Sequence, residues 1–294
     1  MKVEPAARDE FLALMRETYG SAMSGDEFDW WFDRNPAGPR VLNGAVDSGP
    51  ALGVLAMSFF RMRDGLAAYA VHAVTAPAAR GKGVFSLLEL HNEGEAAAAG
   101  ATVALGFTNP MAGPILVGKL GWEDVTRLRI WARPKRLRRR GEGRLRAAAE
   151  RRAFDRRHED AYRREAAAWG NHMVRDVEYL TWRYVETPRE YVRLEREGSW
   201  AVVTHAVWHG FSSAVVADAV GPEKAALLRR APGVVDADLA VAMPNPGEER
   251  AYLAAGFVPT PRTIRFIGKR LAPDAPLPHD RRAWRFSLGD LDFF

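Results

Sequence analysis

One pair of landmarks occurs twice in the sequence, once in each half, and this repeat constrains the fold more than any other feature. Asn109-Pro110 precedes Gly121-Trp122 as Asn245-Pro246 precedes Gly256-Phe257. Both copies predict a strand ending in Asn-Pro, then a helix, then a strand that starts with Gly and an aromatic residue. We infer an internal duplication, with two copies of one α/β unit in tandem.

The first copy shows an α/β alternation that is complete in itself. Apolar residues at helical spacing predict a helix over 8–19, and further helices are expected at 84–98 and 115–120. Runs rich in β-formers predict strands at 41–46, 51–60, 66–75, 101–107 and 125–131. The second copy repeats part of this pattern, with strands expected at 200–208 and 211–219.

Most of the positive charge of the chain lies in one segment between the two copies. Residues 133–164 hold fourteen Lys and Arg against five Asp and Glu, a net +9 in a chain of net charge +5. The Ala/Arg/Glu composition favours helix. We therefore expect a first domain at 1–132, a basic helical linker at 133–170, a second domain at 171–272 and a C-terminal tail at 273–294.

Composition excludes several classes of site and location. The chain has no cysteine, which excludes disulfides, thiolate zinc sites and a cysteine nucleophile. The first residues lack the basic and then apolar run of a signal peptide. The longest apolar run, near 96–107, is too short to span a bilayer. We expect a soluble, cytoplasmic protein with no membrane partner.

The stretch TAPAARGKGVFSLLEL, residues 75–90, places two glycines and two cations at the start of a predicted helix. The first N–H groups of a helix lack intrahelical acceptors, and the helix dipole favours an anion there. Gly81 and Gly83 let a phosphate approach the backbone, and Arg80 and Lys82 attract it. The pattern predicts a pyrophosphate site. It matches neither the Walker loop nor the dinucleotide fingerprint, because Ser or Thr does not follow Gly81-Lys82 and Ser86 replaces the third glycine.

This loop resembles the acetyl-coenzyme A loop of the GCN5-related N-acetyltransferases, at Pro77, Arg80 and Gly83. Phe85 departs from that pattern at its final small position. Asn109 and Gly121-Trp122 resemble the next landmarks of the family, so the resemblance covers about residues 40–130. It implies an α/β fold of two tandem domains, each with a mixed, mainly antiparallel sheet flanked by helices. The second domain is degenerate, because AVGPEKAALL at 219–228 lacks the Arg-Gly-x-Gly loop.

The resemblance also implies an activity, the transfer of an acyl group from acetyl-coenzyme A to an amine that attacks the thioester directly. Strand 66–75 would pair with the pantetheine arm, and the amides of 81–85 would hold the pyrophosphate. The implied donor-binding residues are Ala73, Val74, Thr75, Arg80, Gly81, Lys82, Gly83, Val84, Phe85, Ser86 and Asn109. We expect a small-molecule amine as acceptor and no metal.

Two residues are candidates for catalysis. His72 lies on the strand that would flank the thioester, where it would act as a base or pack beneath a helix. Glu27 lies in an acidic, aromatic patch with Asp29, Trp30 and Trp31 that would attract a cationic amine. The segment Glu178–Pro188 repeats the Glu, Trp and Pro of this patch, which favours a structural role for it.

The general acid is missing from its usual place. Many members of the family have a Tyr four residues before the Gly-aromatic pair, and this position is Val117 here. The second copy has Tyr252 at the matching place but no phosphate loop. Either another group acts as the acid or the thiolate leaves unaided.

Two other functions remain open from the sequence. The Arg-rich linker, around 138–140, would hold tRNA if the donor were an aminoacyl-tRNA, as in some tandem relatives of this fold. The linker's few aromatic residues favour a solvated helix instead. Alternatively, Phe85 and Val117 would fit a non-catalytic module that binds coenzyme A as a ligand.

Overall fold

The computed structural model describes residues 1–20, 23–135 and 153–291, and the chain forms two compact units. Unit 1 comprises residues 1–126 with 265–279, and unit 2 comprises residues 127–264 with 280–294. The boundary falls inside two strands, β6 (Glu123–Pro134) and β12 (Val258–Arg270). Each unit therefore contains a strand segment from the other half of the sequence.

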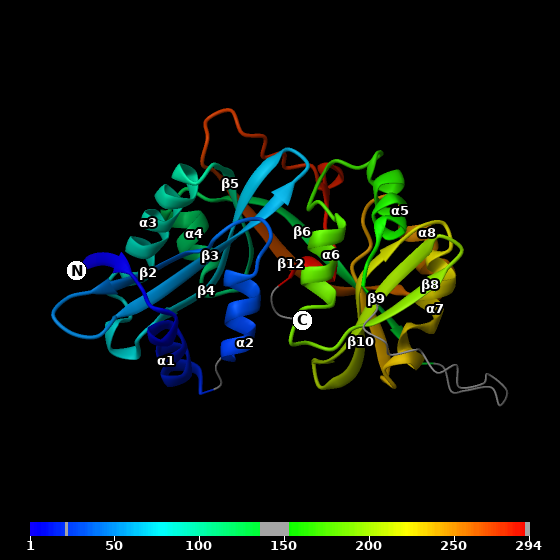
Figure 1. Ribbon diagram of the computed structural model, residues 1–294, viewed down its shortest axis with the longest axis horizontal. Helices are drawn as coiled ribbons and strands as arrows, with labels where there is room; N and C mark the ends of the chain where they lie inside the picture. The colour runs from blue at the N-terminus through cyan, green and yellow to red at the C-terminus, as the bar shows by residue number, and fades with distance from the viewer. Residues whose placement is uncertain (21–22, 136–152, 292–294) are drawn as a thin grey trace. The chain divides into compact units, whose positions relative to one another are not determined.

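Unit 1 is an α/β unit in which five strands and the end of β12 follow the order β1-β2-β3-β4-β5-β12 (Figure 1). The ladder is antiparallel throughout, except that β4 pairs with β5 in parallel. Its elements are β1 (Lys2–Pro5), α1 (Arg8–Tyr19), α2 (Gly25–Phe28), a π-helical turn (Asp29–Asp33), β2 (Val41–Val46), β3 (Gly53–Met62), β4 (Gly65–Thr75), a 3-10 turn (Pro77–Ala79), α3 (Val84–Ala98), β5 (Ala101–Thr108) and α4 (Gly113–Lys119).

Both faces of this sheet are covered, as the alternation of side chains along β3 shows. Leu55 and Met57 lie in one apolar cluster with Leu88 of α3. Ser58, on the opposite face, accepts a hydrogen bond of 3.1 Å from the indole Nε1 of Trp31. Trp31, the tryptophan of the repeated Glu, Trp and Pro pattern, therefore has a structural role in unit 1, because its hydrogen bond joins the π-helical turn to β3.

Unit 2 repeats this plan with the strand order β8-β9-β10-β11-β6. Again a single parallel pair, β10 with β11, lies in an otherwise antiparallel ladder. Its elements are α5 (Arg156–Ala166), β7 (Asn171–His172), α6 (Val177–Tyr184), β8 (Val192–Arg196), β9 (Ser199–Trp208), β10 (Phe211–Val220), α7 (Lys224–Val234), β11 (Leu239–Ala242), α8 (Glu249–Ala255), two 3-10 turns (Arg281–Ala283 and Leu288–Asp290) and β13 (Trp284–Arg285).

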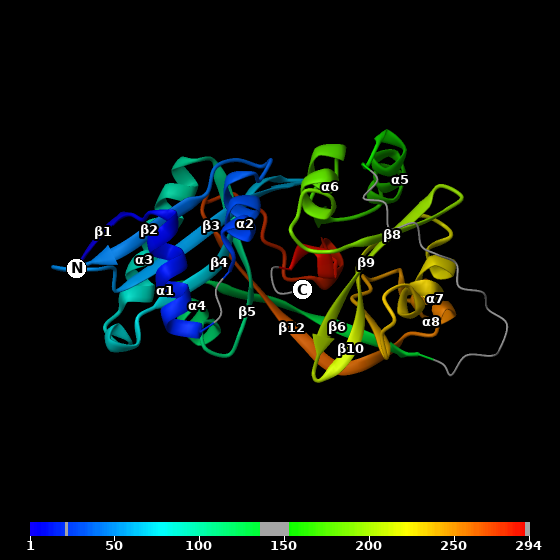
Figure 2. The same cartoon turned by 60° about the horizontal axis from the view of Figure 1, so that its bottom comes forward.

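Helices cover both faces of the sheet of unit 2 as well. α7 and α8 lie side by side on one face, where Leu227 and Tyr252 join an apolar cluster with Val203 of β9 (Figure 2). On the other face the indole of Trp200 donates a hydrogen bond of 3.1 Å to the carbonyl of His158 in α5. This face also carries the C-terminal segment, which packs on β10.

The predicted fold class is confirmed, because the chain is an α/β protein with mixed, mainly antiparallel sheets flanked by helices. The compact units differ from the contiguous stretches expected from the sequence. Residues 265–272 lie with unit 1 instead of the second domain, and the tail is divided at residue 279. Of the predicted linker, residues 136–152 lie outside the described residues, and Arg156–Ala166 forms a helix of unit 2 with Ala161 and Tyr162 buried.

Candidate functional site: the glycine loop of unit 1

The parallel pair of unit 1 opens partway along its length. The described pairing of β4 with β5 runs from Leu66 to Tyr69, which lies opposite Leu105. β4 continues to Thr75 with β3 as its antiparallel partner. The backbone of 70–75 therefore presents a strand edge on its other side, and an extended ligand can pair with such an edge. Ala73, Val74 and Thr75, predicted to bind the donor, lie on this segment.

A β-bulge lies in the same segment, at His72. Leu55 pairs with Ala73 and Ala56 pairs with Val71, so His72 is the extra residue, with a φ of +49°. Its half-buried ring meets the ring of Phe32 edge-on, with 6.1 Å between centroids. Bulges re-aim side chains and are common beside active sites. His72 thus lies on the opened part of β4 where the sequence predicts a base, and its role as a base stays a prediction.

The loop after β4 has the backbone of an anion site. Gly81 and Gly83 have φ values of +78° and +81°, which other residues seldom adopt. Gly83 is the N-cap of α3 and has no side chain that could cap the first N–H groups of the helix. The first turn of α3 has no acidic residue that would repel an anion. A Cβ at either glycine would meet no heavy atom of the described residues within 4 Å, so the space above them is open within that part of the chain. Arg80 and Lys82 are exposed beside it.

The first turn of α3 packs closely against β3 and β4. Val84 is 1% exposed, and a Cβ on Gly53 of β3 would lie 2.6 Å from Val84 Cγ1 and 2.9 Å from the carbonyl oxygen of Val74. The amide of Ala76 donates to the carbonyl of Leu52 over 2.9 Å. Close packing of α3 against β3 and β4 therefore fixes the direction in which the first-turn N–H groups point. Phe85 and Ser86 follow there, both half-buried.

Solved structures share this architecture, although no family model and no curated protein sequence matches the chain. A GCN5-related N-acetyltransferase from Kribbella flavida aligns with a TM-score of 0.62 and 17% identity over 93% of this chain and 72% of its own. One from Anabaena variabilis aligns with a TM-score of 0.65 and 11% identity over 92% and 72%. Eis1 from Mycobacterium abscessus aligns with a TM-score of 0.58 and 13% identity over 92% and 74%. The chain has the GCN5-related N-acetyltransferase fold.

Within this GCN5-related fold, Asn109 lies where the sequence predicts it, directly after β5. Its side-chain oxygen accepts hydrogen bonds of 2.9 Å from the amides of Met111 and Ala112, and the residue is exposed. The side-chain oxygen of Asn109 therefore stabilises the turn that leads into α4. A donor contact by Asn109 stays a prediction.

The acidic patch of unit 1 has structural partners. The Glu27 carboxylate accepts a hydrogen bond from the amide of Ser24 over 3.3 Å, and the Ser24 hydroxyl accepts one from the amide of Glu27, which forms a capping box. Asp29 accepts two hydrogen bonds from the guanidinium of Arg8, at 2.6 and 3.1 Å. Trp30 and Trp31 are buried. These contacts support the structural interpretation of the patch, and the catalytic role expected of Glu27 gains nothing from them.

The two positions considered for a general acid lie in apolar surroundings. Val117 packs its half-buried side chain beside the cluster of Leu116, Leu120 and Trp122. Tyr252 in unit 2 is 5% exposed, and burial, followed by the charge of Glu248, raises the pKa of its hydroxyl well above the ordinary value. A phenol shifted in this direction holds its proton more tightly. The GCN5-related fold of this chain thus has no tyrosine acid at position 117.

Sequence reasoning missed a buried polar cluster on α3. Glu89 is 1% exposed, and its Oε1 has no hydrogen-bond partner among the described residues. Burial, with the nearby charge of Glu93, raises the pKa of Glu89 to about 8, although Lys269 acts in the opposite direction. Glu93 accepts from Trp122 Nε1 over 2.7 Å and from Lys269 Nζ over 2.5 Å. Polar residues at 89, 92 and 93, on one face of the helix, were the available signal.

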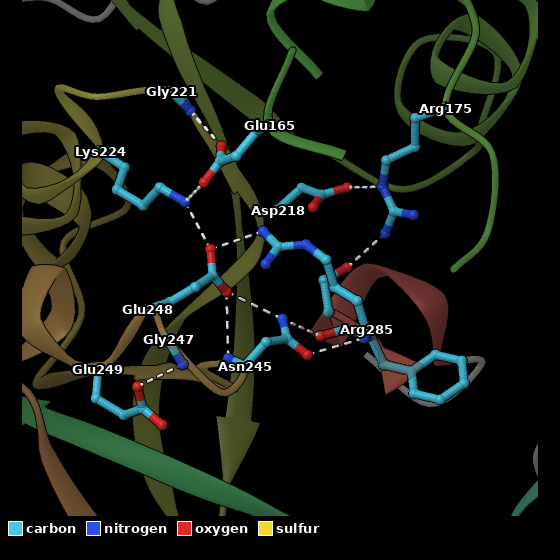
Figure 3. Close-up of polar contacts among 12 residues, drawn as sticks. Glu165, Arg175, Asp218, Gly221, Lys224, Asn245, Gly247, Glu248, Glu249 and Arg285 are labelled. Carbon is cyan, nitrogen blue, oxygen red and sulfur yellow. Dashed lines mark hydrogen bonds and ion pairs between the residues drawn. The ribbon is translucent and has the colours of Figure 1, made fainter. Parts of the chain in front are cut away.

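A second network, in unit 2, was also missed. The guanidinium of Arg175 contacts Asp218 at 2.5 Å (Figure 3). It also contacts Asp290 at 2.7 Å, and all three side chains are buried. The hydroxyl of Tyr184 donates to Asp218 over 3.0 Å. Asp290 belongs to the C-terminal segment, so this network fixes residues 287–291 against β10.

Neither a metal cluster nor a membrane span is found in the described parts of the chain. Over residues 1–20, 23–135 and 153–291, no three His, Asp or Glu side chains are grouped to hold a metal ion. Within the same residues, no helix is both long and apolar enough to cross a membrane.

Proposed function

We propose that the chain is an acyl-coenzyme A-dependent N-acyltransferase, with its donor site at the glycine loop of unit 1. The observation that carries this proposal is the uncapped N-terminus of α3 behind Gly81 and Gly83, beside an opened edge of β4. The solved structures of similar fold include proteins described as GCN5-related N-acetyltransferases, which supports acyl transfer as the reaction class.

The residues present fit a pyrophosphate and an extended arm. The space over Gly81 and Gly83 is open, and the N–H groups of residues 83–86 form the first turn of α3. Arg80 and Lys82 add positive charge at the entrance. Residues 73–75 of β4 offer backbone groups to the pantetheine amides. When bound, the donor supplies an acyl thioester for attack by an amine.

The chain itself then has to orient the amine, accept its proton and tolerate the developing charge. His72, re-aimed by the bulge, is placed on β4 to accept the proton at a ring nitrogen, either directly or through water. Backbone N–H groups on the open edge of β4 would stabilise the developing oxyanion. Because position 117 is valine, the thiolate leaves without a proton from that place. We take acetyl as the acyl group and a small-molecule amine as the acceptor.

Calorimetric titration with acetyl-coenzyme A tests the donor site. We expect wild type to bind acetyl-coenzyme A with a Kd on the order of micromolar. Gly83→Asp should abolish binding, because a carboxylate would occupy the anion site. Gly100→Asp is the matched control, since Gly100 follows the same helix at its other end, with a φ of +96° and open space at its Cβ. That variant carries the same strain and charge but should bind normally.

Three outcomes would contradict the proposal. Equal loss of binding in Gly83→Asp and Gly100→Asp would mean that strain, not the loop, is responsible. No binding by folded wild type would remove the coenzyme A site altogether, and aminoacyl-tRNA would become the donor to test. Binding without turnover over a broad panel of amines would instead favour a non-catalytic module.

A further inference from the structure

The loop of unit 2 that corresponds to the glycine loop can be identified from strand pairing alone. β10 is antiparallel to β9, parallel to β11 and followed by α7, just as β4 is antiparallel to β3, parallel to β5 and followed by α3. Both parallel ladders stop early, at Tyr69 in unit 1 and at Val215 in unit 2. A register shift follows in each case. The connection 221–223 is thus the counterpart of 76–83.

The unit 2 loop already holds an anion, and that anion is a side chain of the protein. The Glu165 carboxylate, from α5, accepts a hydrogen bond of 2.8 Å from the amide of Gly221 (Figure 3). It also forms an ion pair with Lys224 Nζ. Gly221 has a φ of +100°, so this loop too uses a glycine in the left-handed region. A backbone amide and a cation at the start of a helix are the same donors that bind phosphate elsewhere.

Glu165 is one of two carboxylates that pair with the buried ammonium of Lys224. Lys224 is buried and touches Glu248 at 2.5 Å as well as Glu165. Glu248 is in turn paired with Arg285 at 2.6 Å. The four side chains in these contacts are therefore two carboxylates, Glu165 and Glu248, and two cations, Lys224 and Arg285. Removal of Glu165 leaves one buried positive charge uncompensated, and a buried unpaired charge is unfavourable unless another anion replaces the lost one.

Space for such an anion exists beside the carboxylate. A cavity of about 450 Å³ is lined by Gly221, Lys224, Gly247, Arg164 and Arg250, together with Glu165 and Glu248. This volume lies within the range of small-ligand pockets. Glu165 is 25% exposed, so its carboxylate lies where the cavity meets the buried Lys224.

We propose that the Glu165 carboxylate takes, within unit 2, the place of a bound phosphate, so that this copy of the fold is closed to an anionic donor by its own chain. A latent diphosphate site lies beneath Glu165, formed by the amide of Gly221 and the ammonium of Lys224.

The test uses inorganic pyrophosphate as the probe, in the full chain with the unit 1 loop disabled by Gly83→Asp. Calorimetry should show at least about tenfold tighter binding in Gly83→Asp/Glu165→Ala than in Gly83→Asp alone. Glu249→Ala on the same background is the control, because Glu249 contacts the amide of Gly247 at the same cavity without touching Lys224. It removes an equal charge and should give no gain.

Failure of this inference is distinguishable from failure of the proposed function. The inference is overturned if folded Gly83→Asp/Glu165→Ala, or the shape-preserving Glu165→Gln variant, binds no better than the control. It is also overturned if wild type takes up two equivalents of pyrophosphate. A wild type that binds no acetyl-coenzyme A would contradict only the donor site of unit 1, since the gain expected on removal of Glu165 does not depend on that site.

Discussion

Replacing Glu89 with glutamine tests whether the buried polar cluster of α3 holds a proton at neutral pH. The carboxyl of Glu89 is 1% exposed, and burial, together with the charge of Glu93, raises its pKa from 4.5 to about 8. The folded state therefore keeps this proton at pH values where the unfolded chain has lost it. Between about pH 4.5 and pH 8 the folded state binds more protons, so the free energy of unfolding falls as the pH rises.

The size of the effect follows from the shift of the pKa. The difference between 4.5 and about 8 corresponds to about 5 kcal/mol, at 1.36 kcal/mol for each unit of pKa. Glutamine has nearly the same shape and does not ionise. We expect Glu89→Gln and wild type to be nearly equally stable at pH 4.5. The variant should be more stable than wild type by about 3 kcal/mol at pH 7 and about 5 kcal/mol at pH 9.

The assay is urea unfolding of both proteins at several pH values and constant ionic strength, followed by tryptophan fluorescence. Glu95→Gln is the control, because Glu95 is exposed on the same helix. A stability difference between Glu89→Gln and wild type that stays flat from pH 4.5 to pH 9 would refute the reasoning. A difference that grows equally in the Glu95 variant would show that the charge of the helix, not burial, is responsible.

Two further substitutions test how the site and unit 2 are supported. Gly53→Ala should weaken acetyl-coenzyme A binding on the order of tenfold, because the added Cβ would displace Val84. The control Gly44→Ala should bind normally, because its Cβ would meet no described atom nearer than 3.5 Å. Equal affinities of the two variants in calorimetry would contradict the packing argument. Asp218→Ala should lower the free energy of unfolding by about 3–5 kcal/mol, because it leaves the buried charge of Arg175 without one partner. A loss below about 1 kcal/mol in urea unfolding would mean that Asp290 alone satisfies Arg175.

Local sequence signals were sufficient for several helices and strands of unit 1. The helices at 8–19 and 84–98 begin and end where helical spacing of apolar residues and a following glycine predict them. The strand at 41–46 also has its predicted bounds. These signals are reliable because they depend on side chains within a few residues of one another. The same holds for Gly81 and Gly83, whose positive φ values follow from the turn they form.

Signals that depend on distant residues were incomplete. The sequence shows an acidic residue at 29 but does not show that the guanidinium of Arg8 pairs with it. It predicts a strand that starts at Gly256-Phe257 but does not show that 265–270 pairs with β5 in the first unit. Pairing of strands and ion pairs is decided by the fold as a whole, because many partners of similar chemistry compete for each group.

The sequence by itself determined the duplication, the α/β class and the position of the glycine loop, since each of these follows from residue types at short spacings along the chain. Only the tertiary structure decided which groups are removed from water and which partners they meet. Burial beside Glu93 changes the acidity of Glu89, and the approach of α5 brings Glu165 to the amide of Gly221. The burial of Glu89 and the contact of Glu165 with Gly221 both depend on packing between segments that are far apart in the chain.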